Sequence, residues 1–82
     1  MRYKVCSIRD RAADVYSQPM FFNSIGGAVR AFGDEVKRVA DNNNLHKHPE
    51  DFDLYLVAEF DDESGEFIPQ VPKMVAVGKD YV

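Results

Sequence analysis

Apolar residues recur every three or four positions between residues 25 and 40, and this periodicity constrains the fold more than any other feature of the chain. Such spacing is typical of an amphipathic helix that places one face on a core and the other in water. We therefore predict a helix over about residues 24–41, with Asn23 as its N-cap and the polar run 41–44 at its end. The apolar stripe consists of Ile25, Ala28, Val29, Phe32, Val36, Val39 and Ala40.

Three glycines lie within this predicted helix, at positions 26, 27 and 33. Each glycine in a helix lowers its stability by about 1 kcal/mol relative to alanine. The helix is therefore expected to depend on packing, and its glycines would allow another backbone to approach closely. Asp34 and Arg38 have the i,i+4 spacing that predicts an ion pair on the exposed side of the helix.

Two segments with alternating side chains are expected to form the main strands of a small sheet. The first spans residues 3–8, and neither of its faces is wholly apolar. The second spans residues 53–60 and is the more regular of the two. Because successive side chains of a strand point to opposite faces, one apolar face is predicted to contain Leu54, Leu56, Ala58 and Phe60.

A hairpin is expected to follow the second strand, because residues 61–65 are acidic and end in Ser-Gly. Residues 66–68 would form its returning strand. Pro69 and Pro72 are expected to interrupt this strand, because proline has no N–H for a sheet ladder. A last short strand is predicted at residues 73–77.

The remaining segments are predicted to be less regular. Residues 16–22 contain Pro19, so we expect an irregular or edge segment there. A short helical turn is predicted near residues 49–52, because proline suits the first helical position and acids suit the first turn. The chain should therefore be one α+β domain, residues 1–82, with one amphipathic helix packed on a small, mainly antiparallel sheet of three to four strands.

A chain of 82 residues has room for one core, and self-association would be a natural way to bury more surface. Cys6 is the only cysteine, so neither an internal disulfide nor a cysteine-rich zinc site is expected. We also expect no signal peptide and no membrane-spanning segment, because charges occur at the start of the chain and no apolar run approaches ~18 residues. These features predict a soluble protein of a reducing cytoplasm.

Four residues that can bind a divalent metal lie close together, namely His46, His48, Glu50 and Asp51. The His-x-His spacing is common and no third ligand motif stands elsewhere, so a solvated loop is the favoured interpretation. The chain also lacks a Gly-x-Ser-x-Gly elbow and a convergent set of acid, base and nucleophile. We therefore predict no catalytic residue, no metal and no cofactor, and a protein that is not an enzyme.

The net charge of −4 argues against a protein whose whole surface binds nucleic acid, but it allows a local basic patch. Mixtures of cations and aromatic rings bind single-stranded nucleic acid. From the residues alone, a set of solvated charges and core tyrosines is the favoured interpretation, because the overall balance is acidic. Tyr16 would be a further stacking surface. The candidate contacts are Arg2, Lys4, Arg9, Arg11, Lys37, Arg38 and Lys47, with Tyr3 and Tyr55 as candidate stacking residues.

Several segments carry a more specific signal. The block Lys-His-Pro-Glu-Asp-Phe at residues 47–52 is the most distinctive, within a longer stretch that continues to residue 62. Residues 3–10, Tyr-Lys-Val-Cys-Ser-Ile-Arg-Asp, and residues 28–32, Ala-Val-Arg-Ala-Phe, fit the same pattern. These segments resemble the small nonstructural protein of gokushovirus-type microviruses, which are phages with small circular single-stranded DNA genomes.

The resemblance implies a nonstructural DNA-binding protein that acts in the switch to single-strand synthesis and packaging. It defines no catalytic or binding residues. We therefore expect non-specific binding of single-stranded DNA during genome replication or packaging, by a homo-oligomer in the host bacterial cytoplasm. The alternative is a non-enzymatic, homo-oligomeric interaction module that makes no DNA contact and binds phage or host replication or capsid proteins.

Overall fold

The computed structural model describes all 82 residues of the chain. The strands are β1 (Arg2–Asp10), β2 (Val15–Tyr16), β3 (Met20–Phe22), β4 (Phe52–Asp61) and β5 (Phe67–Val77). The helices are α1 (Ile25–Lys37) and α2 (Asn44–Lys47), and 3₁₀ turns span Pro49–Asp51 and Gly78–Tyr81. None of the helices combines the length and the apolar character that a membrane crossing requires.

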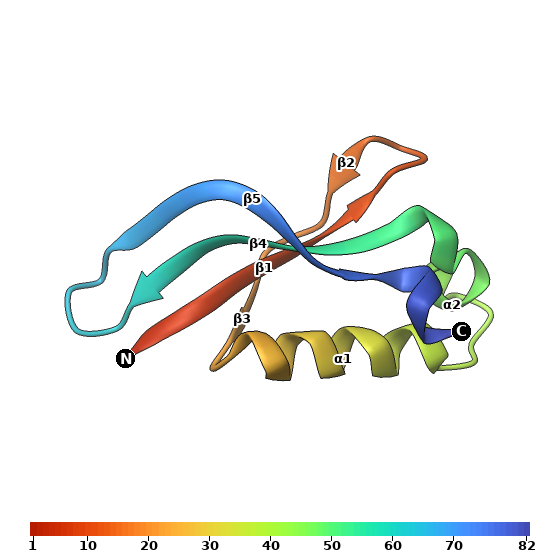
Figure 1. Ribbon diagram of the computed structural model, residues 1–82, viewed down its shortest axis with the longest axis horizontal. Coiled ribbons are helices and arrows are strands. Elements are labelled where there is room, and N and C mark those ends of the chain that lie inside the picture. Colours follow the sequence, from red (N-terminus) through yellow and green to blue (C-terminus); the bar gives the residue numbers. More distant parts are fainter.

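All five strands form one antiparallel sheet, and α1 packs against one face of it (Figure 1). The strand order is β2-β1-β4-β5, and β3 pairs with the N-terminal part of β1. The opposite face carries no helix, and we call it the helix-free face. The predicted α+β fold is confirmed, but the sheet has five strands instead of three to four, because short segments on both sides of Pro19 pair with β1.

Strand β5 is continuous from Phe67 to Val77, so the prediction that Pro69 and Pro72 interrupt it is wrong. The strand lies at the edge of the sheet, where only one side has a partner and a missing N–H is tolerated. Its register with β4 shifts twice, between Leu54 and Tyr55 and between Leu56 and Ala58, and the second shift lies next to the Ala58–Pro69 pair. The pairing of β5 is therefore irregular both at the prolines and beyond them.

Helix α1 is shorter than the predicted range of about 24–41. Its N-cap is Ser24 and not Asn23, because the Ser24 Oγ accepts a hydrogen bond of 3.0 Å from the Gly27 amide. At the other end the chain leaves the helix after Lys37, since Arg38 has an extended conformation. The apolar stripe beyond this point therefore does not continue the helix.

Residues beyond α1 fold back and satisfy its free carbonyl groups. The buried side chain of Asn43 donates hydrogen bonds to the carbonyl oxygens of Glu35 and Arg38, at 2.7 and 2.9 Å. The Nδ1 of His46 lies 2.9 Å from the carbonyl oxygen of Val36. The asparagine-rich run thus follows the end of the helix and caps it.

Arg38 does not form the predicted ion pair with Asp34. It binds Glu35 instead, with 2.6 Å between Nη2 and Oε1. Because Arg38 has left the helical path, the i,i+4 geometry no longer applies to it. The hydrogen bonds from Arg38 lower the pKa of Glu35 from its ordinary value of 4.5.

An extra residue in β4, Val57, reverses the alternation of side chains between the two faces in the second part of the strand. Cys6 pairs with Leu56, whereas its neighbour Val5 pairs with Ala58, so Val57 lies between two registers. Cross-strand neighbours share a face of the sheet. Leu54 and Leu56 therefore face α1, whereas Ala58 and Phe60 face away from it. The prediction that all four share one face is wrong.

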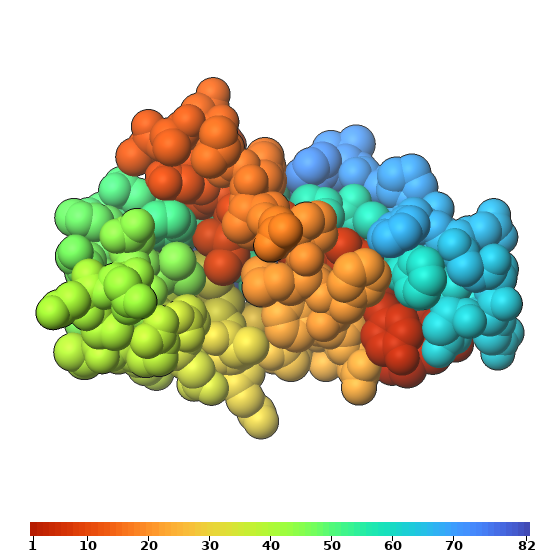
Figure 2. Space-filling view, turned by 180° about the vertical axis from the view of Figure 1, so that it is seen from behind, coloured from red at the N-terminus to blue at the C-terminus, as the bar shows by residue number.

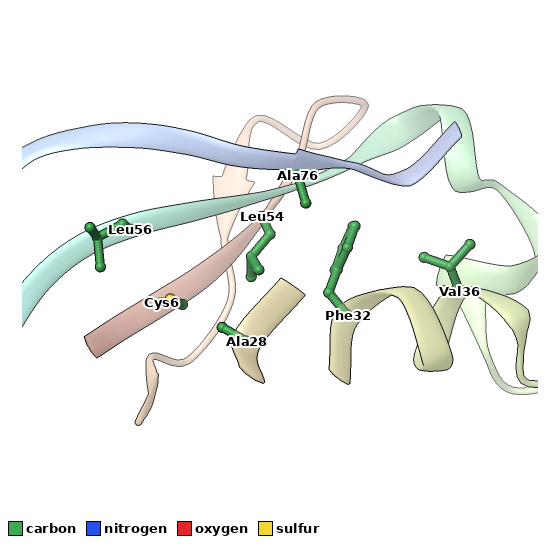
Figure 3. Packing of buried hydrophobic residues seen from close by; sticks show 7 residues of the cluster. All are labelled: Cys6, Ala28, Phe32, Val36, Leu54, Leu56 and Ala76. Atoms are coloured by element: carbon green, nitrogen blue, oxygen red, sulfur yellow. The ribbon is translucent and has the colours of Figure 1, made fainter. Parts of the chain in front are cut away.

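The core lies between α1 and the sheet, and Phe32 points from the helix toward the strands (Figure 3). The largest fully buried side chains are those of Leu54, Val36 and Cys6. Burial raises the pKa of the Cys6 thiol, which keeps it protonated and unreactive at neutral pH. The whole cluster consists of Cys6, Ala28, Phe32, Val36, Leu54, Leu56 and Ala76.

Two glycines of α1 allow a matched test of packing against helix propensity. An added Cβ at Gly33 would lie 2.7 Å from the ring of Tyr81, whereas one at Gly26 would meet nothing within 4 Å. We expect Gly33→Ala to lower the free energy of unfolding by about 1–3 kcal/mol, because the ring must move. Gly26→Ala should raise it by up to about 1 kcal/mol. Urea denaturation measures both effects, and equal stabilisation by the two changes would show that Tyr81 does not constrain the helix.

Candidate nucleic-acid interface

Aromatic and charged side chains gather on the helix-free face, near the C-terminal end of β1 and the start of β4. The register places Arg9 between Tyr16 of β2 and Asp53 of β4. The neighbouring pair on the same face joins Ser7 to Tyr55. These residues lie opposite α1, because the alternate positions of β1 contribute to the core.

Arg9 lies against a pair of tyrosines. The ring centroids of Tyr16 and Tyr55 are 5.5 Å apart, with 74° between the ring planes. The guanidinium carbon of Arg9 is 5.9 Å from the centroid of the Tyr16 ring, within range of a cation–π interaction. Hydrogen bonds with Asp14 and then Tyr55 raise the pKa of Arg9. This corner of the face therefore combines a permanent positive charge with a Tyr16 ring that is 46% exposed.

A second arginine, Arg11, is bound by a buried carboxylate beside this cluster. Its Nε lies 3.1 Å from Oδ2 of Asp53, whose side chain is 4% exposed. Arg11 also donates a hydrogen bond to the carbonyl oxygen of Glu50. The Nε of Arg9 and the Oδ1 of Asp53 are enclosed and have no hydrogen-bond partner within the chain. Because an unpaired buried carboxylate is costly, Asp53 holds Arg11 firmly.

Phenylalanines extend the aromatic surface toward the β4–β5 turn, which we call the distal end of the sheet. The ring centroid of Phe60 lies 5.8 Å from that of Phe21 and 4.9 Å from that of Phe67. Phe21 is 51% exposed and Phe67 is 58% exposed. Tyr3 pairs with Phe60 across the strands and therefore lies on the same face. Exposed aromatic surface of this kind can stack nucleobases or pack against a protein.

Arg2 and Lys4, two of the predicted contacts, lie on the side of the sheet that faces α1, near the distal end. Both bind Glu59, with 3.6 Å between Arg2 Nη1 and Glu59 Oε1. The hydrogen bond from Lys4, aided by the charge of Arg2, holds the pKa of Glu59 below its ordinary value of 4.5. Glu59 therefore offsets part of the combined positive charge of these two residues.

The three predicted contacts in and after α1 lie around the C-terminal end of the helix. Arg38 is occupied by Glu35, and the Nζ of Lys47 donates a hydrogen bond of 3.0 Å to the carbonyl oxygen of Asp41. Lys37 is exposed in the last turn. Of the predicted set, the structure brings together Arg9, Arg11 and Tyr55, places Tyr3 further along the same face, and leaves elsewhere Arg2, Lys4, Lys37, Arg38 and Lys47.

The sequence pattern did not indicate that Phe21, Phe60 and Phe67 share this face. Regular alternation in β4 would have placed Phe60 with the core, and only the extra residue at Val57 moves it. Asp14 and Asp53 were also missed as partners of the arginines. The only available signal was the density of Phe and Tyr residues in so short a chain.

The two histidines do not share a site. His46 binds a helix carbonyl, as described above. His48 lies with Glu50 and Asp51, and one ligand atom from each lies within 4.8 Å of the others. His48 and Glu50 are exposed, so no enclosed ligand set is formed.

An apolar hollow of about 510 Å³ lies where β1 and β3 meet α1. Figure 2 shows the β2–β3 region in orange beside the green residues around α2, with red atoms of β1 set back between them. Glu35 is the only charged residue of the lining. A hollow of this kind leaves apolar surface available to a partner. Its other lining residues are Ile8, Met20, Phe22, Ala28, Ala31, Phe32, Leu45 and Leu54.

The model of the Phage ORF5 protein family matches residues 3–81, and the chain therefore belongs to this family of phage proteins. It is 40% identical over 65 residues to Protein ORF5 of Chlamydia phage 1, a match that covers 77% of this chain and 68% of that protein. The resemblance to a small protein of gokushovirus-type microviruses is thereby confirmed. No solved structure matches the chain.

Glu59→Gln tests whether the ion pairs with Arg2 and Lys4 stabilise the distal end. Because the folded-state pKa of Glu59 is lowered from 4.5, its stabilising effect is full above that value and is lost as the pH falls through the lowered pKa. We expect the melting temperature of the natural protein to fall more steeply than that of Glu59→Gln below pH 4.5. Glu35, which also has a lowered pKa, lies away from this site and acts equally in both proteins. The pKa of Asp61 is lowered chiefly by a hydrogen bond from the amide of Glu63, which Glu59→Gln leaves in place. Parallel curves would show that the Glu59 pairs contribute nothing.

Proposed function

We propose that this phage protein is a nonstructural protein that binds single-stranded DNA without sequence preference during genome replication or packaging in the host bacterial cytoplasm. The exposed aromatic helix-free face, with Arg9 and Arg11 beside Tyr16 and Tyr55, is the observation that supports the proposal. Every nucleobase has a flat face that can stack on such rings, whatever the sequence. The proposal assigns the protein no catalytic activity.

The charge distribution indicates how much of the affinity for DNA would come from phosphate contacts and how much from base stacking. The net charge is −4, and most of the predicted contacts are paired with carboxylates or carbonyl groups. If only Arg9 and Arg11 meet phosphates, the logarithm of the binding constant should fall with the logarithm of salt concentration with a slope of about −1.4. Stacking would then supply much of the affinity. Duplex DNA should bind more weakly, because its bases are stacked on one another.

Fluorescence anisotropy with a labelled oligothymidylate, at low and moderate salt, tests this proposal. We expect Tyr16→Ala to weaken binding by about 1–3 kcal/mol, because a stacking surface is lost. Tyr16→Phe keeps the ring and should keep the affinity. Lys37→Ala removes an exposed cation far from the face and serves as the matched control. Absence of binding at micromolar protein in low salt would refute the proposal.

The apolar hollow supports a second candidate, a homo-oligomeric interaction module without DNA contact. Its partner would be a second copy or a phage or host replication or capsid protein. Ala31 lies in the hollow yet is exposed, so Ala31→Lys should be accepted by the helix while blocking a docked partner. Light scattering should show an oligomer that Ala31→Lys dissociates and that Asp34→Lys, outside the hollow, leaves intact. A strictly monomeric natural protein that captures none of these partners would exclude this candidate.

A further inference from the structure

The two arginines of the helix-free face differ in how exposed their acidic partners are. Asp53, which binds Arg11, has a side chain that is 4% exposed, whereas Asp14, which binds Arg9, has one that is 80% exposed. Separating Arg11 from Asp53 would leave a carboxylate buried and unpaired. Separating Arg9 from Asp14 returns Asp14 to water, and exposed ion pairs of this kind contribute little to stability. Arg9 is therefore the cation on this face that can exchange its partner.

Arg9 is also placed where a nucleotide would be held. Its guanidinium lies over the ring of Tyr16, and Tyr16 packs edge-to-face with Tyr55. In the free chain Nη2 binds Asp14 at 2.8 Å, whereas Nε is enclosed and has no partner. A phosphodiester oxygen can therefore replace the carboxylate oxygen of Asp14 at Nη2, because a guanidinium forms charge-assisted hydrogen bonds with both groups. The adjoining base would then meet the exposed ring of Tyr16.

The turn between β1 and β2 presents the carboxylate of Asp14 to Arg9. Residues 11–14 form this turn, and Oδ1 of Asp10 accepts hydrogen bonds from the amides of Ala12 and Ala13 at 3.0 and 3.2 Å. Asp14 has φ of 58°, in the left-handed region that glycine and asparagine also enter. Glycine or asparagine could adopt this backbone conformation, but only aspartate also places a negative charge next to Arg9.

We propose that Arg9 binds a backbone phosphate of single-stranded nucleic acid, and that Asp14 occupies the phosphate position in the free protein and is displaced on binding. This inference rests on the proposed function. It adds the residue that binds one phosphate and the carboxylate of the protein that competes with that phosphate. Asp14 keeps the guanidinium extended over Tyr16 before the ligand arrives. It also lowers the affinity, because each binding event must first break the Arg9–Asp14 pair.

The variant Asp14→Asn isolates the charge, because asparagine has nearly the same shape and adopts the left-handed conformation readily. We expect its affinity for a labelled oligothymidylate to rise about twofold to fivefold, as the loss of one exposed ion pair implies. Asp34→Asn removes the same charge from an exposed position of α1, away from the helix-free face. This control should change the affinity by less than Asp14→Asn does.

A double-mutant cycle with Arg9→Gln shows whether Asp14 acts through Arg9. The gain from Asp14→Asn should disappear when Arg9 is already glutamine. An equal gain with and without Arg9, or a gain no larger than that of Asp34→Asn, would overturn the inference while leaving DNA binding intact. If the natural protein binds no oligonucleotide, the proposed function fails together with this inference.

Should Arg9→Gln fail to fold, NMR of the Arg9 Nε–H group in the natural protein and in Asp14→Asn replaces the cycle. Addition of the oligothymidylate should shift this signal in both proteins, at lower ligand concentration in Asp14→Asn. An unshifted signal during saturable binding would contradict the assignment of Arg9 to the phosphate.

Discussion

The extra residue at Val57 of β4 determines which side of the sheet each distal side chain occupies. Before it, Leu54 and Leu56 face α1 and form the centre of the core. After it, Ala58 and Phe60 face the other way, where α1 does not reach. One strand therefore supplies both the core and the exposed aromatic face. Both the stability of the domain and its candidate interface depend on this bulge.

Helix α1 is the element against which segments from several parts of the chain pack. Its glycines weaken it as an isolated helix, so its neighbours must stabilise it. At its C-terminal end, Asn43 and His46 bind its carbonyl groups. Tyr81 packs against Gly33, and its ring lies 6.0 Å from that of Phe32 at 90°. The segment that directly follows the helix and the distant C-terminal turn thus both pack against it and stabilise it.

Local patterns in the sequence predicted the helix, the two central strands and the family resemblance, because each of these depends on neighbouring residues. The bulge at Val57 depends on pairing with a distant strand, and the cap from Asn43 depends on how the chain turns back after the helix, so no periodic pattern contains either. The predicted cluster of basic contacts shows a different limit of prediction from sequence. Arg2 and Lys4 occupy even positions of β1 and Arg9 an odd one, so strict alternation already separates them onto opposite faces. Their carboxylate partners, from β4 and the β1–β2 turn, could not be read from β1 alone.

The helix covers only part of a molecule that extends 40 Å along its longest axis. The distal end has no second layer, and it is held by half-exposed phenylalanine rings and by the pairs of Glu59. Backbone with few buried contacts opens more often than backbone in a core. The sheet therefore has one half that the helix supports and another that it does not. Any partner of the distal end would meet strands whose backbone opens more readily than that of the strands beside the helix.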